Sequence, residues 1–335
     1  MKKNSASFII KCILLALPFM VIAAVYFICD PYMVLHKYKR YDKSCMFLNE
    51  SFVGWQTYLN NKDSAKFNSF MLGNSCTMGI KCSSWEKYIG KDSHAIRLYG
   101  NAERLSSVYL KMKALDSIHA PLKHVMVVAN ITLVENSTLT PFATNLLPPG
   151  QGDISEAQFQ CSFLQAFFVP SNLFSFLDYN IFHQYRKSMD GIINPFGVIR
   201  NPINCEAINP HEEEIAKMDD RYWTIHKGKF ELTRKASLHK PVIREQQYEL
   251  LMKIANICRK NHTDFKFIIG PEYDQVKLNH KDFIALQKVF GRNNVYDFTG
   301  KNCLTDNIHN FYDPDHFRPI AGDYMLKVVY GQSCH

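Results

Sequence analysis

The order of apolar and polar residues along the chain predicts strands that alternate with helices. Short apolar runs ending at glycine or another turn residue indicate buried strands, and apolar residues at every third or fourth position indicate helices. Strands are predicted at residues 67–72, 93–98, 123–129, 264–269 and 294–298, and helices at 102–119, 242–260, 281–290 and 319–331. This alternation predicts a parallel sheet within a three-layer α/β/α domain.

The N-terminal segment has a different pattern. Residues 7–29 are almost wholly apolar, and the unbroken run from Cys12 to Cys29 is just long enough to span a bilayer, with Lys11 at its start. The small residues Ala23-Ala24 are followed by bulky side chains, which disfavours a cleavage site. We therefore expect an uncleaved transmembrane anchor in contact with membrane lipid, with a cleaved signal peptide as the alternative.

The remaining boundaries follow from this anchor. Residues 1–6 are expected in the cytoplasm and the body outside it, because the residues after the anchor have the pattern of an exported domain. Basic residues after the anchor (Lys37, Lys39, Arg40 and Lys43) weaken the usual charge signal for orientation. Residues 30–62 show no clear period and are interpreted as a linker and lead-in to the domain at 63–335.

A long segment interrupts the strand–helix rhythm at about 135–240. It holds Pro148-Pro149-Gly150 and a dense aromatic stretch from Phe159 to Tyr185. We interpret it as an inserted helical segment. It either forms a packed subdomain or provides a lid or ligand groove beside the site, since long insertions in α/β folds often carry function.

Composition narrows the class of protein. The 335 residues are 47% hydrophobic and 21% charged, which is typical of a globular chain, and the net charge is +8. We attribute the positive charge to the membrane flank and expect no nucleic-acid partner, because no zinc-finger spacing or RNA-binding aromatic motif is present. The ten cysteines include no Cys-x-x-Cys pair, so no structural zinc is expected. Disulfides and buried free thiols both remain open.

Two distant stretches carry the candidate chemistry. The apolar run Phe70-Met71-Leu72 ends in Gly73-Asn74-Ser75, and the second stretch is Asp313-Pro314-Asp315-His316. Serine becomes a nucleophile when a base removes its proton, and a histidine held by a carboxylate is such a base. Ser75, His316 and Asp313 are therefore predicted as nucleophile, base and orienting acid of a catalytic triad.

The predicted strands bring further residues to the same place. Gly100 follows the second strand and Asn130 the third, and ligands of open parallel sheets bind beyond the carboxyl ends of the strands. The backbone N–H groups of Ser75 and Gly100 and the side-chain amide of Asn130 are predicted to form the oxyanion hole.

Each candidate also has an ordinary explanation as a turn serine, a helix-start Asp-x-x-His, a turn glycine or a capping asparagine. Cys76 is an alternative nucleophile. The residues His309, Asp313, Asp315 and His316 are an alternative metal site, although a metal would not explain Ser75. We expect no metal and no cofactor.

At these residues the chain resembles the SGNH (GDSL-like) hydrolase superfamily. It is most similar to the membrane-anchored branch related to alginate and peptidoglycan O-acetyltransferases and to the D-alanylation accessory protein of teichoic acids. The matching motifs are Gly73-Asn74-Ser75, Gly100 and the tail from Asp313 to Gly322. Asn74 replaces the aspartate of the Gly-Asp-Ser form, and the Gly-x-Asn-Asp block is absent, with Ala129-Asn130 near its place.

The resemblance implies a flavodoxin-like SGNH fold over roughly residues 65–332 and an acyl-Ser75 intermediate. It implies an extracytoplasmic serine acyltransferase, located in the bacterial cell envelope or periplasm, that O-acylates (most simply O-acetylates) a cell-surface or secreted polysaccharide. The acyl donor would be delivered by a membrane-bound O-acyltransferase. Two alternatives stay open. One is an SGNH carbohydrate esterase that removes acetyl groups, and the other is a catalytically silent scaffold in a glycan-modification system.

Overall fold

The chain divides into two compact units. The computed structural model describes residues 2–42, 44–138, 142–195, 199–231 and 236–331. Unit 1 comprises Met1–Leu48 and Ile154–Gly197, and unit 2 comprises Asn49–Asp153 and Val198–His335. Unit 1 contains α1 (Lys2–Cys29), α6 (Glu156–Phe168), α7 (Pro170–Phe182) and the 3₁₀ helix η3 (Lys187–Met189).

Unit 2 is built around a five-stranded parallel sheet, as the sequence predicts. Its strands are β1 (Ser69–Gly73), β2 (Ala95–Tyr99), β3 (His124–Ala129), β7 (Asp264–Ile269) and β9 (Val295–Asp297), in the spatial order β2-β1-β3-β7-β9. All four neighbouring pairs are parallel. Counted along the chain, the order is 2-1-3-4-5, so the direction of winding reverses between β1 and β3.

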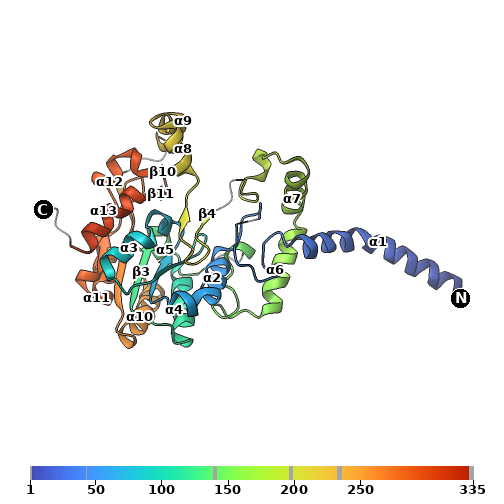
Figure 1. The fold of residues 1–335 in the computed structure, drawn as a ribbon, viewed down its shortest axis with the longest axis horizontal. Coiled ribbons are helices and arrows are strands. Elements are labelled where there is room, and N and C mark those ends of the chain that lie inside the picture. The colour runs from blue at the N-terminus through green and yellow to red at the C-terminus, as the bar shows by residue number, and fades with distance from the viewer. Residues whose placement is uncertain (1, 43, 139–141, 196–198, 232–235, 332–335) are drawn as a thin grey trace. The chain divides into compact units, whose positions relative to one another are not determined.

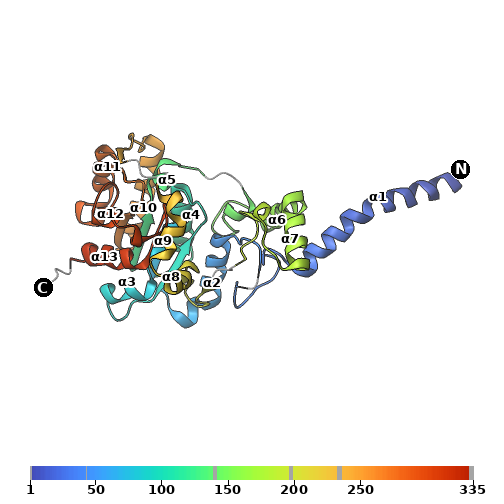
Figure 2. The ribbon, with the colours of Figure 1, turned by 90° about the horizontal axis from the view of Figure 1, so that it is seen from above.

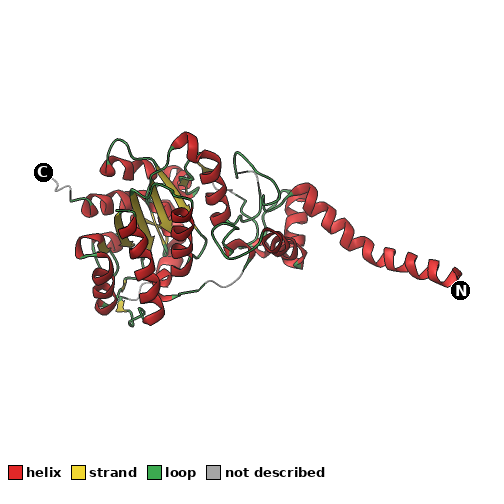
Figure 3. Cartoon of the chain, turned by 90° about the horizontal axis from the view of Figure 1, so that it is seen from below, coloured by secondary structure: helices red, strands yellow, loops and turns green. Residues whose placement is uncertain are grey.

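Helices cover both faces of this sheet (Figures 1 and 3). Strand β1 shows why: Phe70 and Leu72 enter the core on one face and Met71 enters the core on the other. Helices α2 (Glu50–Ala65), α4 (Leu105–Ser117), α10 (Glu245–Lys260) and α11 (His280–Phe290) pack on the Phe70 side. Helices α3 (Cys82–Ile89), α8 (His211–Met218), α9 (Arg221–Glu231) and α13 (Pro319–Val329) pack on the Met71 side.

Shorter elements complete unit 2. Two antiparallel pairs are β4 (Ile199–Arg200) with β5 (Ala207–Ile208) and β10 (Phe311–Asp313) with β11 (His316–Phe317), and β6 (Ser237–Leu238) pairs in parallel with β8 (Val276–Lys277). The short helices are η1 (Ser75–Gly79), α5 (Ile131–Glu135), η2 (Ala143–Asn145), η4 (Arg292–Asn294), α12 (Cys303–Asp306) and η5 (Ile308–Asn310).

The lead-in predicted at 30–62 contains a helix that the sequence pattern hides. Helix α2 starts after Asn49, whose side chain accepts a hydrogen bond from the Phe52 N–H, and unit 2 begins at Asn49 instead of residue 63. Its first turn buries Glu50, which forms a buried ion pair with Arg200. A buried charged residue in the first turn interrupts the apolar stripe by which such a helix is recognised in a sequence.

The segment predicted as one insertion, 135–240, is divided between the units. Residues Ile154–Gly197 belong to unit 1, whereas Val198 onward belongs to unit 2. Tyr222, Trp223 and Phe230 of α9 are buried in the core on the Met71 side of the sheet. The α8–α9 part is therefore packed protein core.

Helix α1 includes the predicted anchor. Within the described residues it is the one helix long and apolar enough to cross a membrane, over Ser7–Cys29, a test that a signal sequence also passes. The helix begins at Lys2, so the described part of the predicted cytoplasmic segment 1–6 is helical too.

Candidate active site

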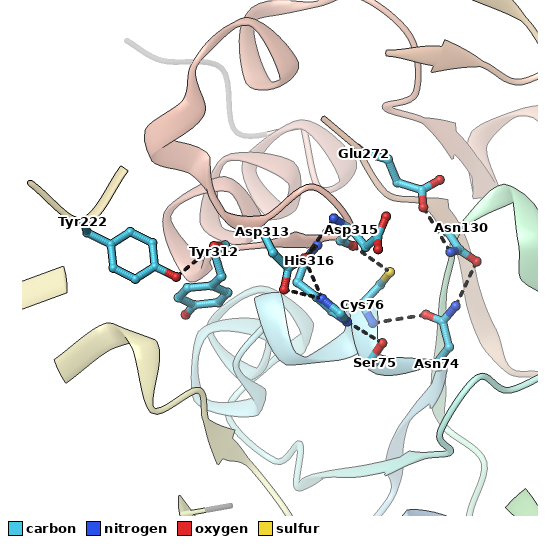
Figure 4. Close-up of polar contacts among 10 residues, drawn as sticks. All are labelled: Asn74, Ser75, Cys76, Asn130, Tyr222, Glu272, Tyr312, Asp313, Asp315 and His316. Carbon is cyan, nitrogen blue, oxygen red and sulfur yellow. Dashed lines mark hydrogen bonds and ion pairs between the residues drawn. The ribbon is translucent and has the colours of Figure 1, made fainter. Parts of the chain in front are cut away.

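Ser75, His316 and Asp313 meet in space with triad geometry (Figure 4). The Ser75 Oγ lies 2.8 Å from His316 Nε2, across 241 residues of chain. The His316 Nδ1 lies 2.9 Å and 3.0 Å from the two carboxylate oxygens of Asp313. Nucleophile, base and orienting acid are thus in hydrogen-bond contact, which is the arrangement that activates a serine hydroxyl.

The end of β1 places the serine. Gly73 has φ +133°, and a Cβ there would lie 1.9 Å from the Val128 carbonyl oxygen of β3, so the sheet requires glycine at this position. The next residue, Asn74, caps η1 by accepting a hydrogen bond from the Cys76 N–H at 3.1 Å. Ser75 is therefore the first residue of a short helix just beyond the carboxyl end of β1, where the sheet reverses its winding.

A β-hairpin holds the base and the acid. Strands β10 and β11 pair Asp313 with His316 across the tight turn at Pro314-Asp315. The Asp313 Oδ1 also accepts hydrogen bonds from the backbone N–H groups of Asp315 and His316, at 2.9 Å and 3.0 Å. One carboxylate thus shapes the turn and orients the imidazole.

Helix α9 supports this hairpin from behind. The Tyr222 hydroxyl donates to the Tyr312 carbonyl oxygen at 2.8 Å (Figure 4). The Trp223 Nε1–H donates to the Phe311 carbonyl oxygen at 3.0 Å. Both donors are buried, so these hydrogen bonds are shielded from water. Helix α9 lies in the segment predicted as an insertion at 135–240. This segment therefore supplies a structural support for the predicted triad that the sequence pattern did not reveal.

Close backbone packing joins the two halves of the site. A Cβ on Gly322 of α13 would lie 1.8 Å from the Gly79 carbonyl oxygen of η1. Phe317, which follows His316, is buried against Gly79 and Gly270. Helix α13 can approach η1 this closely because Gly322 lacks a side chain, and Gly79 leaves room for the ring of Phe317.

The hydrogen bonds set the charge of the acid and the base. Burial alone would raise the pKa of Asp313, but hydrogen bonds and the charge of His316 lower that pKa below its ordinary value. Burial alone would lower the pKa of His316, but the hydrogen bond and charge of Asp313 raise that pKa above its ordinary value. Asp313 is thus placed so that its carboxylate can stabilise an imidazolium at His316, the state that uptake of the Ser75 proton would produce.

The predicted oxyanion donors differ in their surroundings. Ser75 opens η1, and N–H groups in the first turn of a helix lack partners within it. The Asn130 Oδ1 accepts from Asn74 Nδ2 at 2.8 Å, and its Nδ2 donates to Glu272 Oε1 at 3.2 Å, which leaves one amide hydrogen. The Gly100 N–H donates to the Gly73 carbonyl oxygen at 3.1 Å, so the geometry adds no support for Gly100 as a donor.

Glu272 is a site residue that the sequence pattern did not reveal. It lies three residues past the end of β7 and is bonded to Asn130 (Figure 4). Burial, reinforced by the charge of Asp274, raises the pKa of Glu272 to about 7. Its place beyond the fourth strand of the sheet is the one signal that could have identified it.

The alternatives for this site fare differently. Cys76 is buried, and burial raises the pKa of its thiol well above the ordinary value, which disfavours the thiolate that a cysteine nucleophile requires. Among the described residues no group of three or more histidine, cysteine or acidic side chains is placed to hold a metal ion. His309 instead lies 3.5 Å from Asp220 and packs on the Trp223 ring.

The cysteines carry no cross-links in the described part of the chain. Each of the nine that the structure describes has a free thiol, and Cys334 lies outside the described residues.

Comparisons with known proteins found no relative of the chain. No protein-family model, no curated protein and no solved structure matches the chain.

Proposed function

We propose that the protein is a serine acyltransferase that forms an acyl-Ser75 intermediate. The observation that carries the proposal is the contact of Ser75 Oγ with His316 Nε2 at 2.8 Å, on an imidazole that Asp313 holds at Nδ1. A chance turn serine has no reason to meet a carboxylate-oriented histidine 241 residues away.

The reaction then runs in two balanced halves. His316 takes the Ser75 proton as the oxygen attacks the acyl carbonyl, and the leaving group departs with that proton. An acceptor hydroxyl next gives its proton to His316 as it attacks the ester carbonyl. His316 then returns that proton to the Ser75 oxygen as the bond between this oxygen and the acyl group breaks, which restores free Ser75. The Ser75 N–H and the free amide hydrogen of Asn130 are the donors for the oxyanion formed in each half.

The acceptor is proposed from the resemblance to membrane-anchored SGNH proteins. In that reading, unit 2 has the flavodoxin-like SGNH fold, α1 is an uncleaved anchor and the site faces outside the cytoplasm. The acyl group, most simply acetyl, passes to a polysaccharide hydroxyl after delivery by a membrane-bound O-acyltransferase. The strand order 2-1-3-4-5 and the position of Ser75 at the reversal of winding support the fold.

Ester turnover by the full chain in detergent tests this proposal. With an activated acetyl ester and an oligosaccharide, we expect acetylated oligosaccharide to form in place of free acetate. Ser75→Ala should lower the rate by at least about 10³-fold, because it removes the hydroxyl that forms the acyl intermediate. Acetate release that ignores the acceptor would indicate an esterase. Turnover equal in wild type and Ser75→Ala would contradict the proposal, and no turnover in either would favour a silent scaffold.

A further inference from the structure

Helix α7 exposes aromatic and aliphatic side chains that a water-facing helix would bury. Phe174 is 66% exposed, Ile181 65% and Phe182 59%. Leu173 and Phe176 on the other side of the helix are buried. A helix that is apolar on both its packed and its exposed face is typical of an apolar environment.

The surrounding sequence carries almost no charge. No charged residue occurs between Glu156 at the start of α6 and Asp178 in α7. Asp178 itself is paired with Arg186 at 2.6 Å. This surface therefore offers water few polar groups to bind. Exposed apolar patches of this kind mark interaction sites.

Three polar side chains of α6 and α7 donate hydrogen bonds to the backbone of these two helices. Asn172 Nδ2 donates to the Ala166 carbonyl oxygen at 2.8 Å, Asn180 Nδ2 to that of Phe176 at 2.7 Å, and Ser162 Oγ to that of Gln158 at 2.9 Å. Internal satisfaction of polar groups is what an element in contact with lipid requires, because lipid offers no hydrogen bonds.

Contacts within unit 1 show which part of α1 lies next to α6 and α7. The ring of Phe167 lies 5.5 Å from that of Tyr26, and the ring of Phe168 lies 6.4 Å from that of Phe19. Phe19 precedes the end of the apolar span at Cys29 by about 15 Å at 1.5 Å per residue. The junction of α6 and α7 therefore lies beside the apolar part of α1 (Figure 2).

We propose that α6 and α7 form, with the end of α1, a lipid-contacting platform in which Phe174, Ile181 and Phe182 enter the bilayer beside the anchor. The occupant of this surface is the acyl-chain region of the lipid, because the surface is continuous with the helix proposed to span it. The inference rests on α1 being a membrane anchor, but it is independent of the chemistry at Ser75.

Quenching of tryptophan fluorescence by brominated lipids tests the platform directly. The full chain is reconstituted into phosphatidylcholine vesicles with bromine on the acyl chains, with Phe174→Trp as the reporter. The native tryptophans Trp55, Trp85 and Trp223 are all buried in unit 2 and provide a constant background.

Two further variants make each outcome decisive. Leu15→Trp replaces an exposed residue of α1 and reports the anchor, and Tyr248→Trp replaces an exposed residue of α10 and reports water. We expect Phe174→Trp to be quenched by a fraction comparable to Leu15→Trp, with no quenching of Tyr248→Trp.

The remaining outcomes would overturn the inference in distinguishable ways. Quenching of Leu15→Trp alone would mean that water or another protein covers α7, while the anchor stands. Absence of quenching in both would remove the anchor as well.

Discussion

The helix pairs α6–α7 and α8–α9 come from one interrupted stretch of sequence, and both are rich in aromatic residues, yet they use them in opposite ways. Helix α9 buries Tyr222, Trp223 and Phe230, whereas α7 leaves Phe174 and Phe182 largely exposed. The buried pair donates hydrogen bonds to the strand that leads to Asp313. The exposed pair packs on the apolar helix α1.

This difference teaches that aromatic content alone does not assign a role. Trp223 and Phe174 are both large aromatic residues, but Trp223 is buried and donates a hydrogen bond to a backbone carbonyl, whereas Phe174 is largely exposed. Helix α9 supports the hairpin of the proposed active site, and the α6–α7 pair belongs to the proposed membrane platform. Each prediction below tests one side of this contrast, beginning with the largest effect.

The hairpin that α9 supports should be the most sensitive part of the molecule. Asp313→Asn removes the carboxylate that accepts from His316 Nδ1, and we expect kcat for an activated ester to fall by about 10³–10⁴-fold. The matched control is Asp315→Asn, whose backbone N–H rather than its carboxylate contacts Asp313. Equal losses in the two variants would remove the special role of Asp313.

Truncation of the two contrasted aromatic residues should separate the helix pairs. Trp223→Ala leaves a cavity and an unpaired carbonyl under the hairpin, so we expect unit 2 to lose about 3–5 kcal/mol of stability. Phe174→Ala in detergent should change stability by less than about 0.5 kcal/mol, since it is largely exposed. Chemical denaturation of the full chain measures both. A similar cost for the two variants would erase the contrast.

The contact between η1 and α13 should tolerate no side chain. Gly322→Ala forces a methyl group into the Gly79 carbonyl, so we expect a loss of about 1–3 kcal/mol together with lower activity as Ser75 and His316 separate. Gly228→Ala in α9 is the control, because a Cβ there meets nothing within 4 Å and alanine favours helix. A harmless Gly322→Ala, judged by melting temperature and ester turnover, would refute this account of how the site is assembled.

The smallest expected effect concerns pH. His316 acts as a base only when neutral, so kcat/KM should rise as pH passes upward through its raised pKa. Glu272, with a pKa of about 7, then becomes negative beside Asn130 and opposes the oxyanion. Wild type should therefore lose activity above about pH 7, and Glu272→Gln should not.

Two further comparisons sharpen this pH prediction. Glu272→Gln also removes a charge that raises the pKa of His316, so its acid limb should move to lower pH. Asp274→Asn removes a charge that raises the pKa of Glu272, so its alkaline decline should begin at lower pH. Superimposable profiles of kcat/KM against pH for these variants and wild type would contradict the role given to Glu272.

The central sheet could be predicted because its strands are buried on both faces. Runs such as Phe70-Met71-Leu72 are continuously apolar in that setting, and they end at residues such as Gly73 that the fold requires. Helix α2 could not be predicted from its pattern. Its buried Glu50 is paired with Arg200, 150 residues away, and local sequence cannot reveal such a partner.

The candidate site was predictable only in part, for a similar reason. Ser75 and Asn130 follow strands directly, so the rule that ligands bind beyond strand ends identified them. The Asp313–His316 spacing was local, and the structure gives it as a hairpin turn. The supports of the site, Trp223 and Gly322, act through contacts with distant backbone, which leave no local pattern.

The most direct test of the central claim is the mass of the protein after exposure to an activated acetyl ester. The full chain, its Ser75→Ala variant and its Cys76→Ala variant are compared, with peptide mapping of any adduct. A single acetyl group on Ser75 in wild type and Cys76→Ala, absent from Ser75→Ala, is the predicted result. An adduct that persists in Ser75→Ala and disappears in Cys76→Ala would contradict the account, because the thiol would then be the nucleophile.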